Sequence, residues 1–267
     1  MSDHSHHINA LDDAAWDSPW RRRRVGEKVL CSLGLVLTAL MAPTWPGAVL
    51  VSVAAIALIL GSARIHLHVL AEAMTGPIVF LVLGAVSVLL SVGQSPADAW
   101  WRLGALSIGP ASCRQAVRLF AHGLSGTLAV MVLATTTPMV DLLTWLRRFH
   151  VPEPLLEIAN LTYRLLFVIL DTMLTVLEAQ RCRLGDNPVG PMRGMRRRWE
   201  NTAAAIGSIG VLAWDRAGRL SEGMSHRGFE TTLATLPVER AASPRFVVIA
   251  LAVVAAIWAL SLGVTAP

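Results

Sequence analysis

Two short segments in the second half of the chain combine residue types that could bind carboxylates on a partner. EAQRCRLG (178–185) and EGMSHRGF (222–229) each run from an acidic residue through a small or apolar turn to an arginine and a glycine. An arginine in a helix's last turn can simply complement the helix dipole and donate to terminal carbonyls. Alternatively, its planar, permanently charged guanidinium can hold a carboxylate through two hydrogen bonds. Two such ends would suit two copies, or two homologous copies, of one partner.

A polar stripe precedes the first of these ends. In the segment 155–185, charged residues recur every seven positions and so share one face of the predicted helix: Glu157, Arg164, Asp171 and Glu178. Because a charge in the middle of a lipid bilayer is costly, we expect the helix at 155–180 to lie against or beneath the membrane. The alternative is a stand-alone membrane carrier or enzyme whose substrate cavity this stripe lines. A self-sufficient carrier is typically built from inverted repeats, and the sequence shows no convincing one.

Signatures of catalysis and metal binding are missing from the sequence. It contains no GxxxxGK[ST], HExxH or GxSxG motif, and without a phosphate loop we do not expect the chain to hydrolyse ATP. The three cysteines are too far apart for a disulfide or metal framework. Isolated histidines are more often packing or tail residues than ligands, and we predict no cofactor and no metal site. The residues concerned are Cys31, Cys113, Cys182, His4, His6, His7, His66, His68 and His122.

Composition indicates a membrane protein. Of the 267 residues, 54% are hydrophobic and only 15% are charged, whereas about a quarter of a soluble domain is charged. Leucine, valine, alanine and isoleucine dominate, which favours spanning helices over a barrel of alternating strands. The sequence pI of about 10 does not indicate nucleic-acid binding, since the basic residues flank apolar runs instead of forming one patch.

The apolar runs predict an all-α, polytopic membrane protein with about five spanning helices, at 29–42, 47–61, 76–93, about 116–138 and 245–264. Arginines before the first run and after the second place both ends of that hairpin in the cytoplasm. The same rule puts the N-terminus inside and the C-terminus outside. We therefore divide the chain into an N-terminal cytoplasmic segment, four spanning helices, a cytoplasmic module of long amphipathic helices and a last spanning helix (1–28, 29–140, 141–244 and 245–267).

Five segments resemble a known family over nearly the whole length of the chain. They are ALDDAAWDSPWRRRRVGEK, TTTPMVDLL, YRLLFVILDTM, AQRCRLG and DRAGRLSEGMSHRGF. The chain is similar to the transmembrane (T) component of energy-coupling factor (ECF) transporters, specifically the CbiQ group that serves cobalt uptake. In that family, two Ala-Arg-Gly-type motifs end the coupling helices, and each arginine meets an acidic residue in a groove of an ATPase subunit.

The resemblance implies ATPase-coupling residues at both arginine ends. The first motif corresponds to Ala179, Gln180 and Arg181, with Arg183 as the alternative arginine, and the second corresponds to His226, Arg227 and Gly228. Both depart from a strict Ala-Arg-Gly, because Gln180 is inserted in the first and His226 replaces alanine in the second. The assignment is thus firmer for Arg227 than for Arg181.

The resemblance also implies a function. The chain would be a non-catalytic coupling subunit of an importer for a divalent transition metal in the bacterial inner membrane, with cobalt favoured over nickel. Its partners would be two ABC-type ATP-binding subunits, which hydrolyse the ATP, and a metal-binding membrane (S) subunit. The resemblance also allows a small accessory membrane subunit as a partner. The lipid bilayer surrounds the complex, and no nucleic acid is expected.

Overall fold

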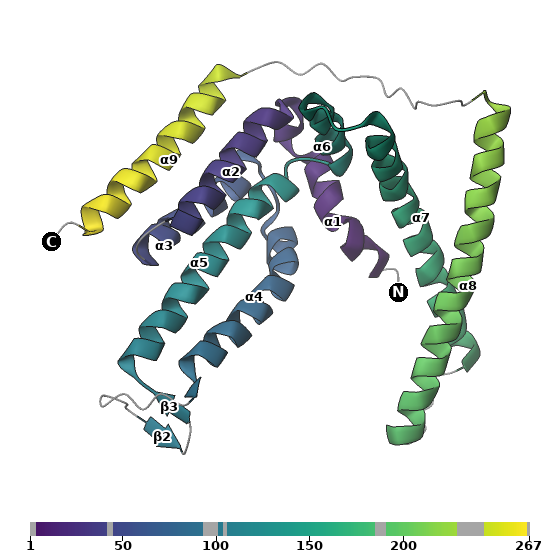
Figure 1. The fold of residues 1–267 in the computed structure, drawn as a ribbon, viewed down its shortest axis with the longest axis horizontal. Helices are drawn as coiled ribbons and strands as arrows, with labels where there is room; N and C mark the ends of the chain where they lie inside the picture. The colour runs from purple at the N-terminus through teal and green to yellow at the C-terminus, as the bar shows by residue number, and fades with distance from the viewer. Residues whose placement is uncertain are drawn as a thin grey trace. The chain divides into compact units, whose positions relative to one another are not determined.

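Long helices make up most of the chain, as the apolar runs predict (Figure 1). A computed structural model describes residues 4–41, 45–92, 101–103, 106–184, 191–228 and 243–265. By their internal contacts the residues fall into two units. One comprises Met1–His7 and Leu143–Pro237, and the other comprises Ile8–Leu142 and Val238–Pro267.

The larger unit contains most of the apolar helices, which are shorter than the two long helices of the second unit. It contains most of α1 (His4–Asp17), η1 (Pro19–Arg22), α2 (Val25–Met41), α3 (Trp45–Ile56), the π-helical η2 (Ala57–Ser62), α4 (Leu67–Leu89), α5 (Pro110–Ala134), part of α6 (Met139–Leu146) and α9 (Pro244–Thr265). Local chemistry sets several of the starts. The Ser18 hydroxyl accepts a hydrogen bond from the Trp20 amide where η1 begins, and Pro110 occupies the first turn of α5, where a missing N–H costs nothing.

A small antiparallel sheet lies in the connection between α4 and α5. Its strands β1 (Ser91–Val92), β2 (Trp101–Leu103) and β3 (Leu106–Ile108) have the order β1-β3-β2. Ser107 pairs with Ser91 on one side and with Arg102 on the other. The sequence did not predict these strands, because each is too short to show an alternating pattern. The prediction of an all-α membrane fold is confirmed, with this loop as a minor addition.

Among the residues that the structure describes, five helices are long and apolar enough to cross a membrane, but they are not the five predicted runs. Four agree in position, namely Trp45–Ser62, Leu67–Leu89, Pro110–Ala134 and Pro244–Ser261. The fifth is Glu153–Ala179, whereas α2 has only 17 residues and falls just short. The third run also begins earlier than residue 76, because α4 continues through Pro77. Length and composition therefore allow the helix at 153–179 to cross, and its predicted place outside the lipid stays a prediction.

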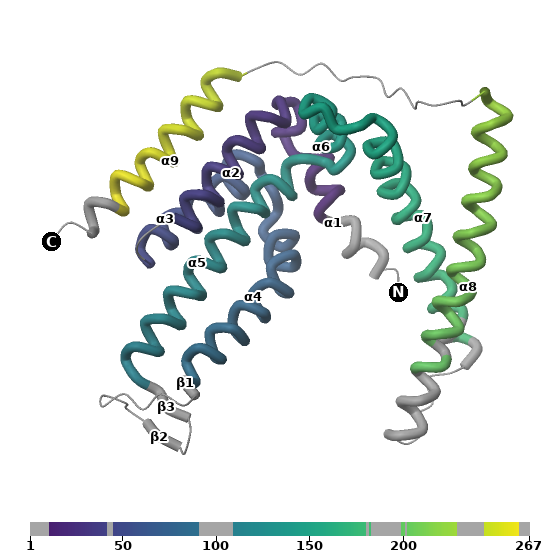
Figure 2. Tube along the Cα trace, viewed as in Figure 1, coloured from purple at the N-terminus to yellow at the C-terminus, as the bar shows by residue number. Residues whose placement is uncertain are grey.

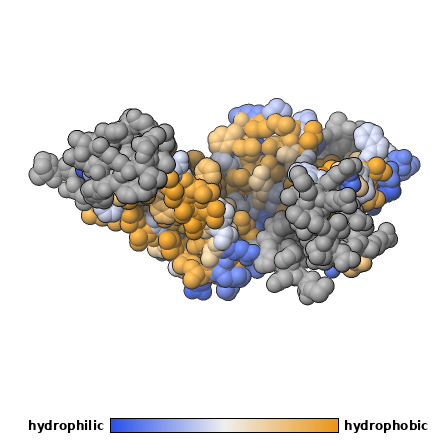
Figure 3. All heavy atoms as spheres, turned by 90° about the horizontal axis from the view of Figure 1, so that it is seen from below, coloured by the Kyte–Doolittle hydropathy of each residue, from blue (hydrophilic) through white to orange (hydrophobic). Residues whose placement is uncertain are grey.

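Alanines and serines allow the helices of the larger unit to pack closely. Ala48, Ala55 and Ala129 are fully buried, and α5 contacts α2, α3 and α4 along its length. Figure 2 shows α4 and α5 side by side. Large apolar side chains point outward, among them Phe80, which is 76% exposed, and Leu40, which is 78% exposed. On the face drawn in Figure 3, apolar residues cover much of the described surface, as expected where lipid replaces water.

The second unit contains η3 (Arg147–Phe149) and two long helices, α7 (Glu153–Leu184) and α8 (Pro191–His226). A tight turn joins η3 to α7. His150 adopts a left-handed conformation with φ of 58°, and Arg147 Nη1 lies 3.6 Å from Glu153 Oε1. Pro152 directly precedes α7, and Pro154 lies in its first turn, where a missing N–H is tolerated.

Candidate functional site

The first predicted coupling end lies in the last turns of α7. This helix has 32 residues and ends at Leu184. Ala179 is exposed on it. The backbone of Gln180, Arg181 and Arg183 is helical, while their side chains lie outside the described part of the structure. Both arginines thus sit within one turn of the helix end, and the choice between them stays open.

The second predicted coupling end closes α8. The Arg227 amide donates to the Met224 carbonyl at 3.1 Å, and the Gly228 amide donates to the Ser225 carbonyl at 3.0 Å. Gly228 has a φ of +72°, the left-handed conformation with which glycine commonly ends a helix. His226, Arg227 and Gly228 are all exposed.

Backbone groups, and not the guanidinium, satisfy the end of α8. Two amides and a left-handed glycine close the last turn, so the helix stop does not require the Arg227 side chain. Within the described residues, that side chain makes no hydrogen bond or ion pair. A purely structural role for Arg227 would therefore be limited to a favourable interaction with the helix dipole.

The two ends are far apart because α7 and α8 form an antiparallel pair. The helices contact each other, and α8 returns along α7 in Figure 1. With 36 residues at a rise of 1.5 Å, α8 extends about 54 Å. The connector 185–190 spans at most about 25 Å. The arginine ends are thus at least roughly 30 Å apart, too far to enter one binding groove.

The polar stripe lies on the continuous helix α7, as its seven-residue spacing predicts. Glu157 is half-buried, whereas Arg164, Asp171 and Glu178 are exposed. Among the residues that the structure describes, no three histidine, cysteine, aspartate or glutamate side chains cluster so as to hold a metal ion. The stripe therefore presents charge on a surface, and it does not form a metal site within the described chain.

Both helices of the pair also expose large apolar side chains. On α7, Leu155 is 58% exposed and Ile158 is 62% exposed; on α8, Trp214 is 81% exposed. The segment of α8 around Trp214 combines small residues with these large ones, as at Gly207 and Gly210. Such a surface suits close packing against another apolar helix.

A polar seam between α2 and α5 was not predicted from the sequence. The Lys28 side chain is fully buried, and its Nζ donates to the Thr136 carbonyl at 2.7 Å. The Ser32 hydroxyl donates to the Ala129 carbonyl at 2.7 Å, and His122 Nδ1 lies 2.9 Å from the Ala39 carbonyl. The three positions on the α5 side are seven residues apart, so the bonds form one line along the antiparallel pair.

The start of α2 also holds α9. Glu27 Oε1 accepts a hydrogen bond from the Ser243 amide at 2.8 Å, at the N-terminus of α9, where a carboxylate complements the dipole. The Trp20 ring meets Phe246 edge-to-face at 4.8 Å, and the Arg23 guanidinium lies 4.3 Å from the centre of the Phe246 ring. The Glu-Lys pair therefore joins three helices.

One sequence signal points in retrospect to this junction, in which Glu27 and Lys28 connect α2 with α9 and α5. Lys28 is the only lysine among the 23 basic residues, and it lies at the start of an apolar run. The segments ending in Glu27-Lys28 and beginning with Thr135 both carried the family resemblance. Their contact could not be anticipated, because 108 residues separate Lys28 from Thr136.

Comparisons with known proteins agree on one family. The family model described as "Cobalt transport protein", CbiQ, matches residues 17–236. The Cobalt transport protein CbiQ of Rhodobacter capsulatus is 37% identical over 94% of this chain and 97% of its own length. The Salmonella typhimurium protein of the same name is 28% identical over 67% of this chain and 80% of its own. A putative fused cobalt transport protein CbiMQ of Methanocorpusculum labreanum is 24% identical over 86% of this chain and 38% of its own.

Proposed function

This chain belongs to the CbiQ family of cobalt transport proteins, the T components of ECF transporters, and we propose that it is the coupling subunit of such a transporter. It is a multi-pass membrane component of cobalt transport. In the proposed mechanism it binds no nucleotide. Two ABC-type ATP-binding subunits close on ATP, and the chain transmits their motion to a separate metal-binding S subunit.

The observation that carries the proposal is the pair of arginine ends on α7 and α8. Arg227 is exposed at a helix end that its backbone already satisfies, which leaves the guanidinium available for a carboxylate. The ends lie at opposite ends of an antiparallel pair, so each needs its own binding groove. An ATPase dimer offers two equivalent grooves, and its closure would change the distance between them.

The exposed apolar residues of α7 and α8 support the second half of the proposal. Side chains such as Ile158 and Trp214 cover faces that an apolar partner could bury. A stiff helix transmits displacement along its length, so a shift at its arginine end would move the contact with the S subunit. The name of the fused CbiMQ relative supports joint action with another membrane subunit.

Co-purification from the native gene cluster tests the proposal. A tagged chain should bring down ABC-type ATP-binding subunits and a metal-binding membrane protein. The ATPase rate of that complex in nanodiscs should rise when the metal is added, and a complex assembled without the S subunit should not respond. Cobalt uptake by vesicles that contain only this chain would instead favour a stand-alone carrier that uses the stripe on α7.

The predicted topology is a condition of this mechanism, since the arginine ends must face the cytoplasm. In a variant without the native cysteines, Ser225→Cys should react with a thiol reagent only after the membrane is made permeable. Ala111→Cys, at the start of α5, is the matched control and should be labelled from outside intact cells. Labelling of residue 225 from outside would exclude an encounter with cytoplasmic ATPases.

A further inference from the structure

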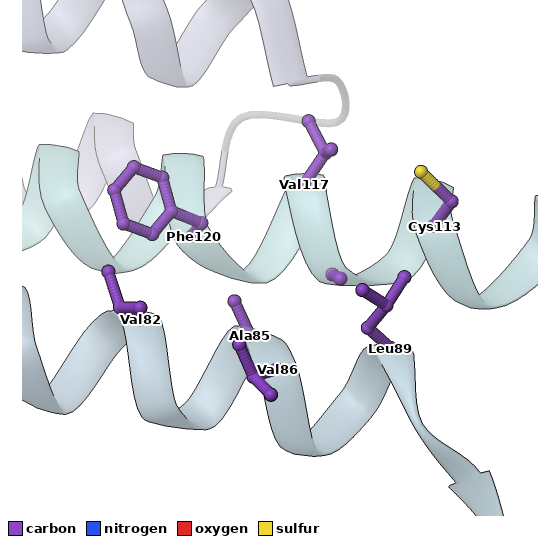
Figure 4. A pocket seen from close by; sticks show the side chains of 8 residues that line it. Val82, Ala85, Val86, Leu89, Cys113, Val117 and Phe120 are labelled. Carbon is purple, nitrogen blue, oxygen red and sulfur yellow. The ribbon is translucent and has the colours of Figure 1, made fainter. Parts of the chain in front are cut away.

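An apolar groove with a volume of about 280 Å³ lies between α4 and α5, near the end where the two helices enter the small sheet (Figure 4). Val82, Val86 and Leu89 of α4 line one side. Cys113, Val117 and Phe120 of α5 line the other. Figure 4 shows the Phe120 ring near one end of the groove and the Cys113 thiol near the other.

The groove is long enough for a single extended chain. From Cys113 to Phe120 the rise is about 10 Å, which is long enough to hold several methylenes of a hydrocarbon chain.

Positive charge lies beside this groove. Arg114 and Arg118 are exposed on α5, one turn apart, and they flank the groove residue Val117. Long arginine side chains can reach from an apolar surface to the level of lipid head groups, where they bind phosphate.

We propose that the groove binds one acyl chain of an anionic phospholipid whose head group Arg114 and Arg118 hold. The apolar walls exclude a polar ligand, and the two guanidinium groups favour a lipid with net negative charge over a zwitterionic one. The bound lipid fills the space between α4 and α5. This site is independent of the coupling role proposed for α7 and α8.

Native mass spectrometry of the full-length chain in detergent tests the site. The chain is titrated with phosphatidylglycerol or with phosphatidylcholine of the same acyl chains. Phosphatidylglycerol should bind about tenfold more tightly, as expected for two arginines near the head group. Val86→Trp should fill the groove and abolish the difference, because residue 86 is 45% exposed and can accept a larger side chain. The pair Arg114→Gln with Arg118→Gln should also abolish it.

Two matched variants on α9 separate this site from general lipid contact. Val248→Trp changes a valine that is 64% exposed, and Arg245→Gln removes an exposed arginine at a helix start. Both should retain the preference for phosphatidylglycerol. Circular dichroism and elution volume show that each variant is folded. Equal binding of both lipids, or an equal loss in the α9 variants, would overturn the proposal.

Discussion

The α2–α5–α9 junction and the α7–α8 pair use the same residue types in opposite ways. In the junction, Lys28 Nζ donates a hydrogen bond to a carbonyl and Glu27 Oε1 accepts one from an amide, both inside the protein. In the pair, Arg164 and Arg227 are exposed. In the most apolar 18-residue stretch of α7 no residue is buried, whereas in the most apolar 18-residue stretch of α5 a third of the residues are buried.

This contrast predicts that charged residues in the two regions have different roles, one in the stability of the chain and the other in its assembly with partners. A fully buried polar side chain that is hydrogen-bonded to a second helix contributes to the packing of its own unit, and its loss is expressed as unfolding. An exposed charge at a helix end contributes little until a partner removes it from water. We therefore expect changes in the junction to lower stability, and changes in the pair to abolish partner binding in a chain that remains folded.

The largest effect should come from reversing both arginine ends. In the double variant Arg181→Glu with Arg227→Glu, each ATPase carboxylate would lose its partner, which costs about 2–5 kcal/mol per site, and would also face a like charge. ATPase association and cobalt uptake should be lost, while expression and membrane insertion stay normal. Arg227→Lys should be impaired as well, since an ammonium cannot form the bidentate contact.

Arg183→Glu is the matched comparison at the first end, and it decides which arginine of that motif is used. If the double variant takes up cobalt normally at normal expression, neither arginine belongs to the mechanism.

The second effect concerns Lys28 in the junction. Lys28→Ala removes a buried hydrogen bond and leaves a cavity, so the free energy of unfolding should fall by about 2–5 kcal/mol. Thermal unfolding of the purified chain in detergent measures it. Arg164→Ala on the exposed stripe is the control and should change stability by less than about 0.5 kcal/mol. Equal losses in the two variants would remove the distinction between the regions.

A smaller effect is expected where α4 meets α5. An added Cβ at Gly123 would collide with Leu81 Cδ2, whereas nothing lies within 4 Å of the same position at Gly126. Gly123→Val should therefore destabilise the larger unit by about 1–3 kcal/mol through overpacking. Gly126→Val, on the same helix with the same change in helix propensity, should be close to neutral in the same thermal assay.

The smallest effect concerns the end of α8. Gly228→Ala places a Cβ in a left-handed conformation, at a cost of about 1 kcal/mol. Hydrogen exchange of the Arg227 and Gly228 amides should accelerate about fivefold, which is what that free energy corresponds to. Gly223→Ala lies within the helix and should slow exchange in the same turn. Unchanged exchange in the Gly228 variant would show that the helix end is not closed by this glycine.

Periodicity and charge were sufficient to predict the class of fold. Apolar runs of spanning length identify membrane helices because backbone groups in lipid must be satisfied within each segment. The bounds were less certain. The third run was predicted to begin at residue 76, yet α4 begins at Leu67 and contains Pro77. A proline in a membrane helix can be accommodated by neighbouring groups, so it is a poor boundary signal.

The candidate site was predictable in place but not in arrangement. The glycine after Arg227 indicated a helix end, and the structure puts it there with a φ of +72°. That the two ends are opposed follows only from the antiparallel contact of α7 with α8. The division into cytoplasmic and spanning segments and the role of both arginines stay predictions, for which Ser225 labelling and the double variant are the tests.

The sequence by itself determined the helical membrane class, the two arginine ends and the family, because each depends on residues that are close together in the chain or on their pattern. Only the tertiary structure decided that Lys28 meets Thr136 and that Glu27 caps α9 at Ser243. Both partners are backbone groups, and every residue except proline has the same amide and carbonyl. No residue type marks which carbonyl will accept a buried lysine, so the contact follows from helix packing and from nothing in the local sequence.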